Sequence, residues 1–292
     1  MNSHSTYPFE TIFSVDVEDW FHILDIPSAP ALPQWAAMPS RVEANFHRLL
    51  DMFSQADAQV TCFFLGWIGE RFPHLVKAAV DRGHEIASHG YAHRLVYEMT
   101  RQQFYEDASH SRKLLEDISG TRVLGYRSAG FSLTERTPWF FDALAEAGYY
   151  YDSSVFPARR GHGGMRGAQR TPHIVGNQAK LLEFPMTVVD LGRVPMCFFG
   201  GGYLRLFPYW LVRSMARKAL RQGCPVVFYV HPREIDPRHP QLPMKWQRRL
   251  KSYVNLRSTE QKILRILRDF PVTTFRSFLA RCAESFVRYC AG

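Results

Sequence analysis

Short apolar runs alternate with amphipathic stretches along most of the chain. Residues 10–17 form an apolar run typical of a buried strand, whereas apolar positions in residues 39–55 recur every three or four residues, as in an amphipathic helix. The stretch SLTE at residues 132–135 has the form of a capping box, which predicts the start of another helix. Further strands are expected at residues 59–67, 84–90, 122–128, 181–187, 225–232 and 272–278. Further helices are expected at residues 73–83, 102–120, 132–148 and 257–270.

This alternation of strands and helices indicates an α/β fold with a parallel sheet covered by helices. About seven strand–helix units in one chain favour a (β/α) barrel over an open sheet. In such barrels the catalytic residues lie at the C-terminal ends of the strands. The sequence contains neither an internal repeat nor a low-complexity linker, so we expect a single domain across residues 1–292.

The composition fits a folded protein that stays out of the membrane. Hydrophobic residues make up 46% of the 292 residues, enough for a sizeable core. Five cysteines without a CxxC spacing argue against both a disulfide framework and a thiolate zinc site. No apolar run reaches the ~18–20 residues of a membrane span, and the N-terminal residues lack the pattern of a secretory signal. We therefore expect a cytoplasmic location.

The charge balance is basic, with 36 Lys and Arg against 27 Asp and Glu, a net charge of +9 at pH 7. These residues are spread along the chain, with a mild concentration in residues 245–258, which is most simply a solvated helical face. No nucleic-acid-binding motif accompanies them, so nucleic acid is not an expected partner. The surplus is compatible with an anionic polysaccharide, a lipid-linked sugar or peripheral contact with a membrane.

Ionisable residues follow two of the predicted strands. The first strand runs into Asp16, Glu18 and Asp19, although an unpaired buried charge is costly. The third strand ends in SHGYAH, with His89 and His93 four residues apart. Two histidines and one carboxylate make a metal site that leaves other coordination positions open. Histidines at this spacing also arise by chance, and it is the acids on an earlier strand that favour a metal site.

Two more strand ends carry candidate residues. Arg127 in GYRSAGF ends the fourth strand and is either a surface arginine or an inward guanidinium that orients a carboxylate. His231 directly follows the apolar run PVVFYV and is either a core histidine or an acid–base residue. Because both belong to the same predicted rim, we favour the functional interpretation of each.

Six stretches in this order resemble the polysaccharide deacetylases, carbohydrate esterase family 4: FSVDVEDWF, GHEIASHGYAH, GYRSAGFS, YDSSVFP, GGGYLRLFPY and FYVHPREID. The branch associated with exosortase and exopolysaccharide gene clusters is the most similar. The resemblance covers residues 10–275 and leaves a C-terminal helix after them. It implies a distorted (β/α) barrel and a divalent metal, usually Zn²⁺. It also implies removal of acetyl groups from an N-acetylated sugar, oligosaccharide or lipid-linked saccharide.

The resemblance also assigns roles to particular residues. Asp16 takes the place of the catalytic base, Arg127 that of the arginine that steadies it, and His231 that of the general acid. The metal histidines correspond to His89 and His93. Strand alternation points Glu18 to the same face as Asp16, so Glu18 is the expected metal carboxylate and Asp19 the alternative. Four aromatic residues are expected to stack on sugar rings: Trp20, Tyr91, Phe131 and Tyr203.

The sequence departs from the family pattern beside Arg127, where Ala129 and Gly130 stand in place of the usual proline motif. Two alternatives to a deacetylase stay open, and this departure is a hint of the second alone. The same barrel hydrolyses cyclic amides of the ureide kind in related proteins. A non-catalytic carbohydrate-binding relative would keep the fold without the activity.

Overall fold

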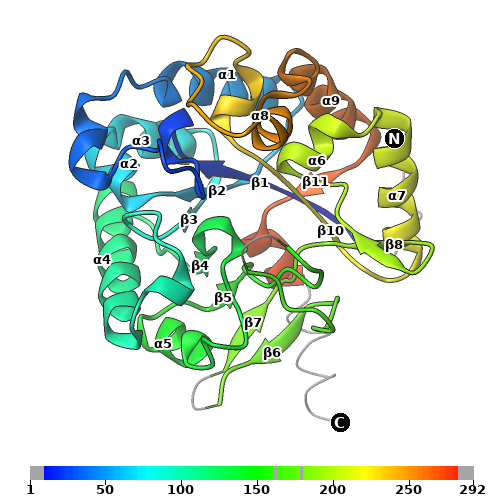
Figure 1. The fold of residues 1–292 in the computed structure, drawn as a ribbon. Helices are drawn as coiled ribbons and strands as arrows, with labels where there is room; N and C mark the ends of the chain where they lie inside the picture. The colour runs from blue at the N-terminus through cyan, green and yellow to red at the C-terminus, as the bar shows by residue number, and fades with distance from the viewer. Residues whose placement is uncertain (1–9, 161–162, 178–179, 282–292) are drawn as a thin grey trace.

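A curled, mostly parallel sheet forms the centre of the computed structural model, which describes residues 10–160, 163–177 and 180–281 (Figure 1). Its strand order is β10-β1-β2-β3-β4-β5-β7-β6, with β11 beside β1. The strands are β1 (Thr11–Val17), β2 (Thr61–Phe64), β3 (Glu85–Ser88), β4 (Gly125–Tyr126), β5 (Tyr151–Asp152), β6 (His173–Val175), β7 (Leu181–Glu183), β10 (Val226–Val230) and β11 (Val272–Thr273). A separate hairpin joins β8 (Val189–Leu191) and β9 (Val194–Met196).

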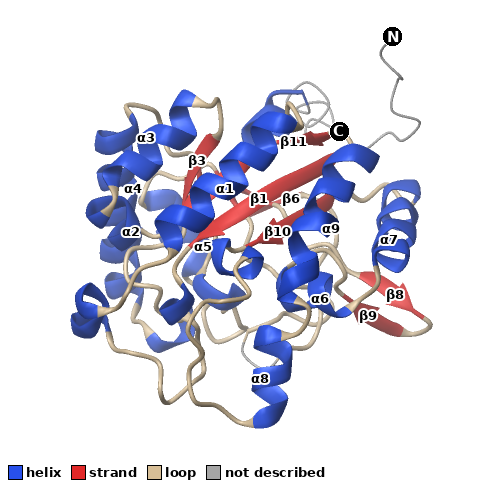
Figure 2. Cartoon of the chain, turned by 90° about the horizontal axis from the view of Figure 1, so that it is seen from above, coloured by secondary structure: helices blue, strands red, loops and turns tan. Residues whose placement is uncertain are grey.

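The helices lie around the outside of the sheet (Figures 1 and 2). They are α1 (Val42–Gln55), α2 (Gly66–Arg71), α3 (Pro73–Asp81), α4 (Arg101–Ser119), α5 (Phe140–Glu146), α6 (Gly201–Leu206), α7 (Tyr209–Arg221), α8 (Trp246–Tyr253) and α9 (Leu256–Asp269). Helices between successive parallel strands are the connections that a parallel sheet requires. Across the described ranges no helix is both long and apolar enough to cross a membrane.

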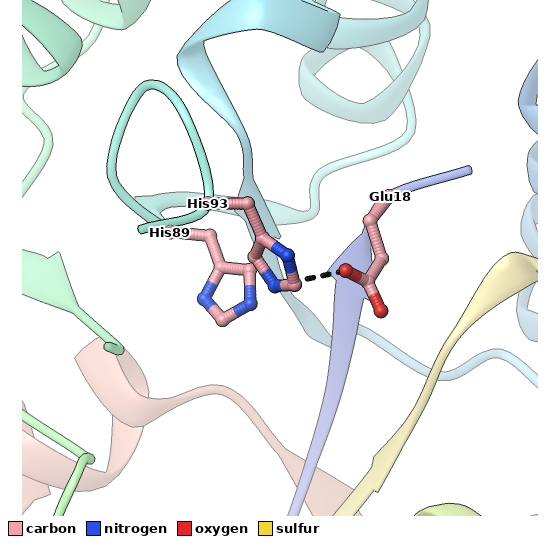
Figure 3. A group of neighbouring side chains, drawn as sticks. All are labelled: Glu18, His89 and His93. Atoms are coloured by element: carbon pink, nitrogen blue, oxygen red, sulfur yellow. Dashed lines mark ion pairs between the residues drawn. The ribbon is translucent and has the colours of Figure 1, made fainter. Parts of the chain in front are cut away.

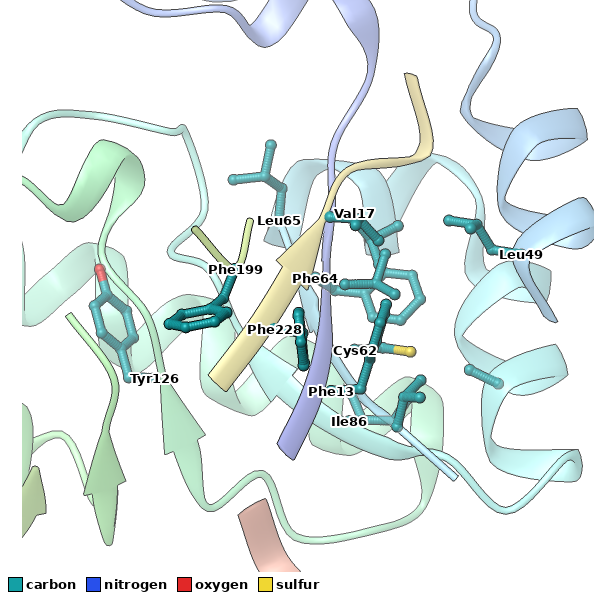
Figure 4. Packing of buried hydrophobic residues seen from close by; sticks show 14 of the residues in the cluster. Phe13, Val17, Leu49, Cys62, Phe64, Leu65, Ile86, Tyr126, Phe199 and Phe228 are labelled. Carbon is teal, nitrogen blue, oxygen red and sulfur yellow. The ribbon is translucent and has the colours of Figure 1, made fainter. Parts of the chain in front are cut away.

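The two-residue period of β1 sorts its side chains between two environments. Phe13 and Val17 pack with Phe64 of β2 and Leu49 of α1 in the main core, between the sheet and its helices (Figure 4). The alternate residues, including Asp16, face the inside of the curled sheet. All of β1 is buried, so the acid at its end has little access to bulk water.

Strand β1 occupies the centre of the sheet although it comes first in the sequence. Its residues 11–15 pair with β10, while residues 14–17 pair with β2. Strand β11 pairs with residues 11–12, below the point where β2 begins. The C-terminal end of β1 is therefore flanked by strands from both halves of the chain.

Two of the predicted elements differ from the structure. The expected strand at residues 272–278 ends at Thr273, and residues 275–281 are helical. The helix expected from Ser132 begins only at Phe140, because the Ser132 hydroxyl accepts a hydrogen bond from the Val96 amide at 2.9 Å instead of capping a helix. Most of the expected C-terminal helix falls in residues 282–292, outside the described residues.

Candidate active site and metal centre

The C-terminal ends of the strands open into a cavity of about 770 Å³. Strands β1, β3 and β10 each end at its wall, as the predicted barrel requires. Five of the predicted catalytic and metal-binding residues line it together: Asp16, Glu18, His89, His93 and His231. The fold thus brings together residues that lie more than 200 positions apart in the sequence.

Glu18, His89 and His93 form a buried group with the chemistry of a metal site. One ligand atom from each lies within 4.8 Å of the others. Glu18 Oε2 is 2.9 Å from His93 Nε2, and the three side chains point toward one another (Figure 3). His89 Nδ1 is 2.8 Å from the carbonyl oxygen of Arg127, which leaves Nε2 to face the group. Two imidazoles and one carboxylate fit a divalent cation such as zinc.

A tight loop, rather than a helix, positions the two histidines. Gly90 has φ 74° and His93 has φ 50°, the left-handed conformation that is uncommon for a residue other than glycine. The Asp107 carboxylate of α4 accepts a hydrogen bond from the Tyr91 amide at 2.8 Å and fastens the loop to that helix. The loop bends back enough for both imidazoles to reach Glu18.

The ionisation of the group suits metal binding. Burial raises the pKa of Glu18, but the neighbouring imidazoles of His93 and His231 outweigh this and lower it, so Glu18 is an anion. Burial lowers the pKa of His89 to about 4, so its imidazole is neutral near pH 7. An anionic carboxylate and a neutral imidazole are the forms that coordinate metals.

Asp19, the alternative metal carboxylate, lies outside this group. Its carboxylate accepts hydrogen bonds from the Trp20 amide at 2.8 Å, the Arg41 amide at 2.9 Å and the Ser40 hydroxyl at 2.6 Å. It therefore ties the short helix after β1 to the start of α1. Asp19 therefore does not belong to the group of possible ligands that Glu18 forms with the two histidines.

Arg127 holds one oxygen of Asp16. Its Nη1 donates to Asp16 Oδ1 at 2.7 Å and to the Ser14 hydroxyl at 2.8 Å, while its Nε donates to the Ser153 carbonyl at 3.2 Å. The Arg127 side chain is fully buried, and its guanidinium carbon lies 4.1 Å from the centre of the Phe63 ring. These contacts fix the arginine even though Ala129 and Gly130 replace the usual proline motif.

His231 lies between the acids of β1 and a carboxylate that the sequence analysis missed. Its Nε2 is 3.3 Å from Glu18 Oε1 and 3.9 Å from Asp16 Oδ2. Its Nδ1 is 3.3 Å from Glu234 Oε2, and Glu234 Oε1 accepts from Arg205 Nη1 at 2.7 Å. The i, i+3 spacing in HPRE is the signal that could have revealed Glu234, since a short helical turn follows β10.

The electrostatics keep His231 able to carry a proton. Burial lowers the pKa of His231, but Glu18, Glu234 and Asp16 together raise it above its ordinary value. Burial raises the pKa of Glu234, but the Arg205 guanidinium reverses this and holds it at about 2. An imidazole with a raised pKa beside anionic carboxylates is suited to donate a proton.

Comparisons with known proteins point to the same family as the sequence motifs. A family model described as polysaccharide deacetylase matches residues 35–151, and one described as a domain of unknown function (DUF3473) matches residues 153–280. The peptidoglycan deacetylase of Helicobacter pylori is 31% identical over 113 residues, which are 39% of this chain and 38% of that protein. These matches support the polysaccharide deacetylase family. The chain covers less than half the length of the curated relatives it matches.

Solved structures support the deacetylase fold over nearly the whole chain. A solved structure from Mycobacterium smegmatis, named "putative polysaccharide deacetylase", has a TM-score of 0.64 at 18% identity, covering 98% of this chain and 93% of that one. An allantoinase has a TM-score of 0.61 at 18% identity, covering 94% of this chain and 90% of that one. These likenesses confirm the predicted α/β class and distorted barrel.

The four aromatic residues expected to bind sugar in a polysaccharide deacetylase divide into two pairs. Phe131 and Tyr203 line the cavity. Trp20 is buried, and its indole donates to the Pro39 carbonyl at 3.0 Å, while the Tyr91 hydroxyl donates to Glu70 at 2.6 Å. Neither Trp20 nor Tyr91 lines the cavity, so neither is placed to stack on a sugar.

Proposed function

We propose that this chain is a metal-dependent N-deacetylase that hydrolyses the acetamide group of an N-acetylated sugar or oligosaccharide. The observation that carries the proposal is the convergence in one cavity of the Glu18–His89–His93 group with a buried carboxylate and a histidine able to carry a proton. The products would be acetate and a sugar with a free amine. The family support adds weight to this substrate class.

Glu18, His89 and His93 would hold the divalent ion, for which we propose Zn²⁺ because of the two imidazole ligands. When bound, such an ion polarises a carbonyl group and lowers the pKa of water. Asp16 would accept the proton of the attacking water at Oδ2, since Arg127 occupies Oδ1. Arg127 keeps that carboxylate in one orientation throughout.

His231 would complete the hydrolysis by donating its Nε2 proton to the departing amine nitrogen. Without that proton the tetrahedral adduct would return to the amide, because an amide anion is a poor leaving group. Glu234 Oε2 lies 3.3 Å from the opposite ring nitrogen, Nδ1, and Arg205 donates a hydrogen bond to Glu234 in turn. We propose that these two residues position the imidazole.

The proposal is tested by metal content and acetate release on oligomers of N-acetylglucosamine. We expect about one ion per chain, and a loss of both ion and activity in His89→Ala and His93→Ala. His231→Ala should keep the ion and lower turnover by roughly 10²–10⁴, the usual worth of a positioned acid. An unchanged ion content in the double histidine variant would contradict the site.

A second, exposed group of possible ligands calls for a control. Glu43, His47 and His74 also lie within 4.8 Å of one another, on the outer surface. His74→Ala removes this group without touching the cavity and should leave activity unchanged. An assay of the same metal-loaded protein on allantoin tests the ureide alternative, which predicts hydrolysis of allantoin. If no N-acetylated sugar released acetate, the deacetylase proposal would be wrong.

A further inference from the structure

Several cationic side chains line the cavity beyond the residues already described. Arg160, Arg233, Arg248 and Lys251 all contribute to its wall. Nη1 of Arg160 and both Nε and Nη1 of Arg233 are buried and have no hydrogen-bond partner within the described ranges. Buried guanidinium donors normally have hydrogen-bond acceptors, because a buried donor without a hydrogen bond costs free energy. These groups therefore indicate a ligand that supplies acceptor oxygens.

The arginines also repel one another. Burial lowers the pKa of Arg248, and the nearby charges of Arg233 and Arg160 lower it further. The charge of Asp25, another residue of the cavity wall, raises the pKa of Arg248. Like charges gathered in a partly buried space are unfavourable until an anion joins them.

The other carboxylates of the cavity are engaged elsewhere. Glu234 pairs with Arg205 at 2.7 Å, and Asp16 pairs with Arg127 at 2.7 Å. Glu18 belongs to the group with the two histidines. None of these three is paired with Arg160 or Arg248 by any contact in the described residues, so the cationic wall keeps a surplus of charge.

We propose that Arg160, Arg233 and Arg248 bind a phosphate group carried by the substrate. This rests on the proposed function and narrows it to an N-acetylated sugar that bears phosphate. A phosphate offers three acceptor oxygens and up to two charges, whereas a carboxylate offers two oxygens and one charge. Three guanidinium groups match the phosphate better.

The position of Arg233 relates this phosphate to the reacting group. Arg233 lies two residues after His231, and its charge contributes to lowering the pKa of Glu18. The phosphate and the acetamide therefore belong on the same or on adjacent sugar units. Because Arg233 is beside the catalytic group, Arg160 and Arg248 provide the cleaner test.

The rim of the cavity bears on the source of the phosphate. Trp246 and Leu250 of α8 and Leu206 of α6 line the cavity with exposed fractions of 73%, 55% and 51%. Such side chains beside cations suit a phosphate linked to a lipid, whereas a soluble sugar phosphate would not need them. A lipid-linked phosphate and a soluble sugar phosphate would present the same phosphate oxygens to the arginines.

The first test measures binding of pyrophosphate by calorimetry to protein stripped of metal with a chelator, so that no ion contributes. We expect binding that weakens with added salt, and a loss of roughly tenfold or more in affinity for each of Arg160→Gln and Arg248→Gln. Arg221→Gln, an exposed arginine at the end of α7, is the matched control and should bind as the wild type. Equal binding by all variants, or none by the wild type, would overturn the proposal.

The second test compares kcat/KM for N-acetylglucosamine 1-phosphate, a short-chain lipid-pyrophosphate-linked N-acetylglucosamine and a neutral methyl glycoside. In the arginine variants, kcat/KM for the phosphorylated substrate divided by kcat/KM for the neutral one should fall about tenfold. A loss of metal lowers both values equally and leaves this ratio unchanged. If the phosphate belongs to a lipid-linked sugar, Trp246→Ala should lower the rate on the lipid-linked substrate and leave the other two rates unchanged.

Equal use of neutral and phosphorylated sugars by the wild type would overturn the phosphate assignment. An absence of acetate from every substrate would instead refute the proposed function, and the pyrophosphate measurement would still decide the anion site.

Discussion

Glu18 and Asp19 are neighbours at the end of β1, and their carboxylates reach different partners. Glu18 contacts His93 in the cavity, whereas Asp19 accepts backbone hydrogen bonds at the start of α1. We predict that Glu18→Gln loses the ion with little change in fold. Asp19→Ala should keep the ion and lose about 1–3 kcal/mol of unfolding free energy, because buried amides lose their acceptor.

Metal analysis and urea unfolding of the two variants check this prediction together. Asp19→Asn is the companion variant, since it keeps one acceptor oxygen and should lose less stability than Asp19→Ala. If Asp19→Ala released the ion while its stability stayed unchanged, the roles of the two acids would be reversed.

Glu234 tests whether His231 needs a partner at its second ring nitrogen. We predict that Glu234→Gln retains the ion and lowers kcat on an N-acetylated sugar by about tenfold, less than His231→Ala does, because the imidazole loses its anionic partner but stays in place. The loss should shrink on an aryl acetate ester, whose leaving group needs no proton. Equal losses on amide and ester would indicate a structural role alone.

At the residue scale, the sequence predicted the positions of those candidate residues that lie at the end of a strand. The structure places Asp16, His89 and His231 at or just after the ends of β1, β3 and β10, where the sequence predicted them. Glu18 lies in the same cavity as Asp16, but strand alternation is not the reason. Strand β1 ends at Val17, and a turn with a 3.0 Å hydrogen bond from the Glu18 amide to the Asp16 carbonyl directs the side chain. The pairing of Arg205 with Glu234 depends on how α6 packs, which no local pattern reveals.

At the scale of elements, β5 and β7 bring two acids side by side in register, Asp152 and Glu183. Both are fully buried. Burial raises the pKa of Asp152 to about 6, and burial together with the charge of Asp152 raises the pKa of Glu183 well above its usual range. The pair therefore holds a proton in the folded chain that the unfolded chain releases above about pH 4.5.

The sign of the resulting pH dependence follows from these raised pKa values. The folded state binds more protons than the unfolded state. The contribution of this pair to the unfolding free energy is therefore fully present below the pKa values of the unfolded chain and is lost as the pH rises through 6 and beyond. Glu183→Gln keeps a hydrogen-bond donor toward Asp152 but removes one titrating group. We predict that the unfolding free energy of this variant, minus that of the wild type, becomes more positive between pH 5 and pH 8, as measured by urea titrations. The same difference at both pH values would contradict the prediction.

The same scale shows why two predicted elements were wrong. In VTTFRSF the apolar pattern suits a strand, but the Thr274 hydroxyl accepts a hydrogen bond from the Ser277 amide at 3.0 Å and starts a helix. In SLTE the hydroxyl that was expected to cap a helix is used by a distant segment, and Gly130 and Phe131 just before it are left-handed. Capping residues are ambiguous when tertiary contacts compete for the same oxygen.

For the whole molecule, the fold class was predictable because alternating strands and helices have few parallel arrangements. The strand order was not, since nothing local specifies that β10 and β11 both return to β1. The two family models divide the chain near residue 152, yet the sheet continues across that point through β5 and β7. We therefore propose that residues 1–292 form one domain.

This proposal predicts that neither half folds alone. Residues 1–152 lack the partner of one edge of β1, and residues 153–292 lack β1 itself. Separately produced halves should show no cooperative urea transition, while the intact chain should unfold in one transition that coincides by fluorescence and circular dichroism. A cooperative transition in the first half would show two domains instead.

The pairing of β1 with strands from the far end of the sequence also matters while the protein is being made. Ribosomes synthesise Thr11–Val17 well before β10, which is complete only when residue 230 has been added. Until then the buried strand that carries Asp16 has an open edge, which invites pairing with other chains. We therefore expect newly made protein to be prone to aggregation until β10 has been added, even though the finished fold buries that strand entirely.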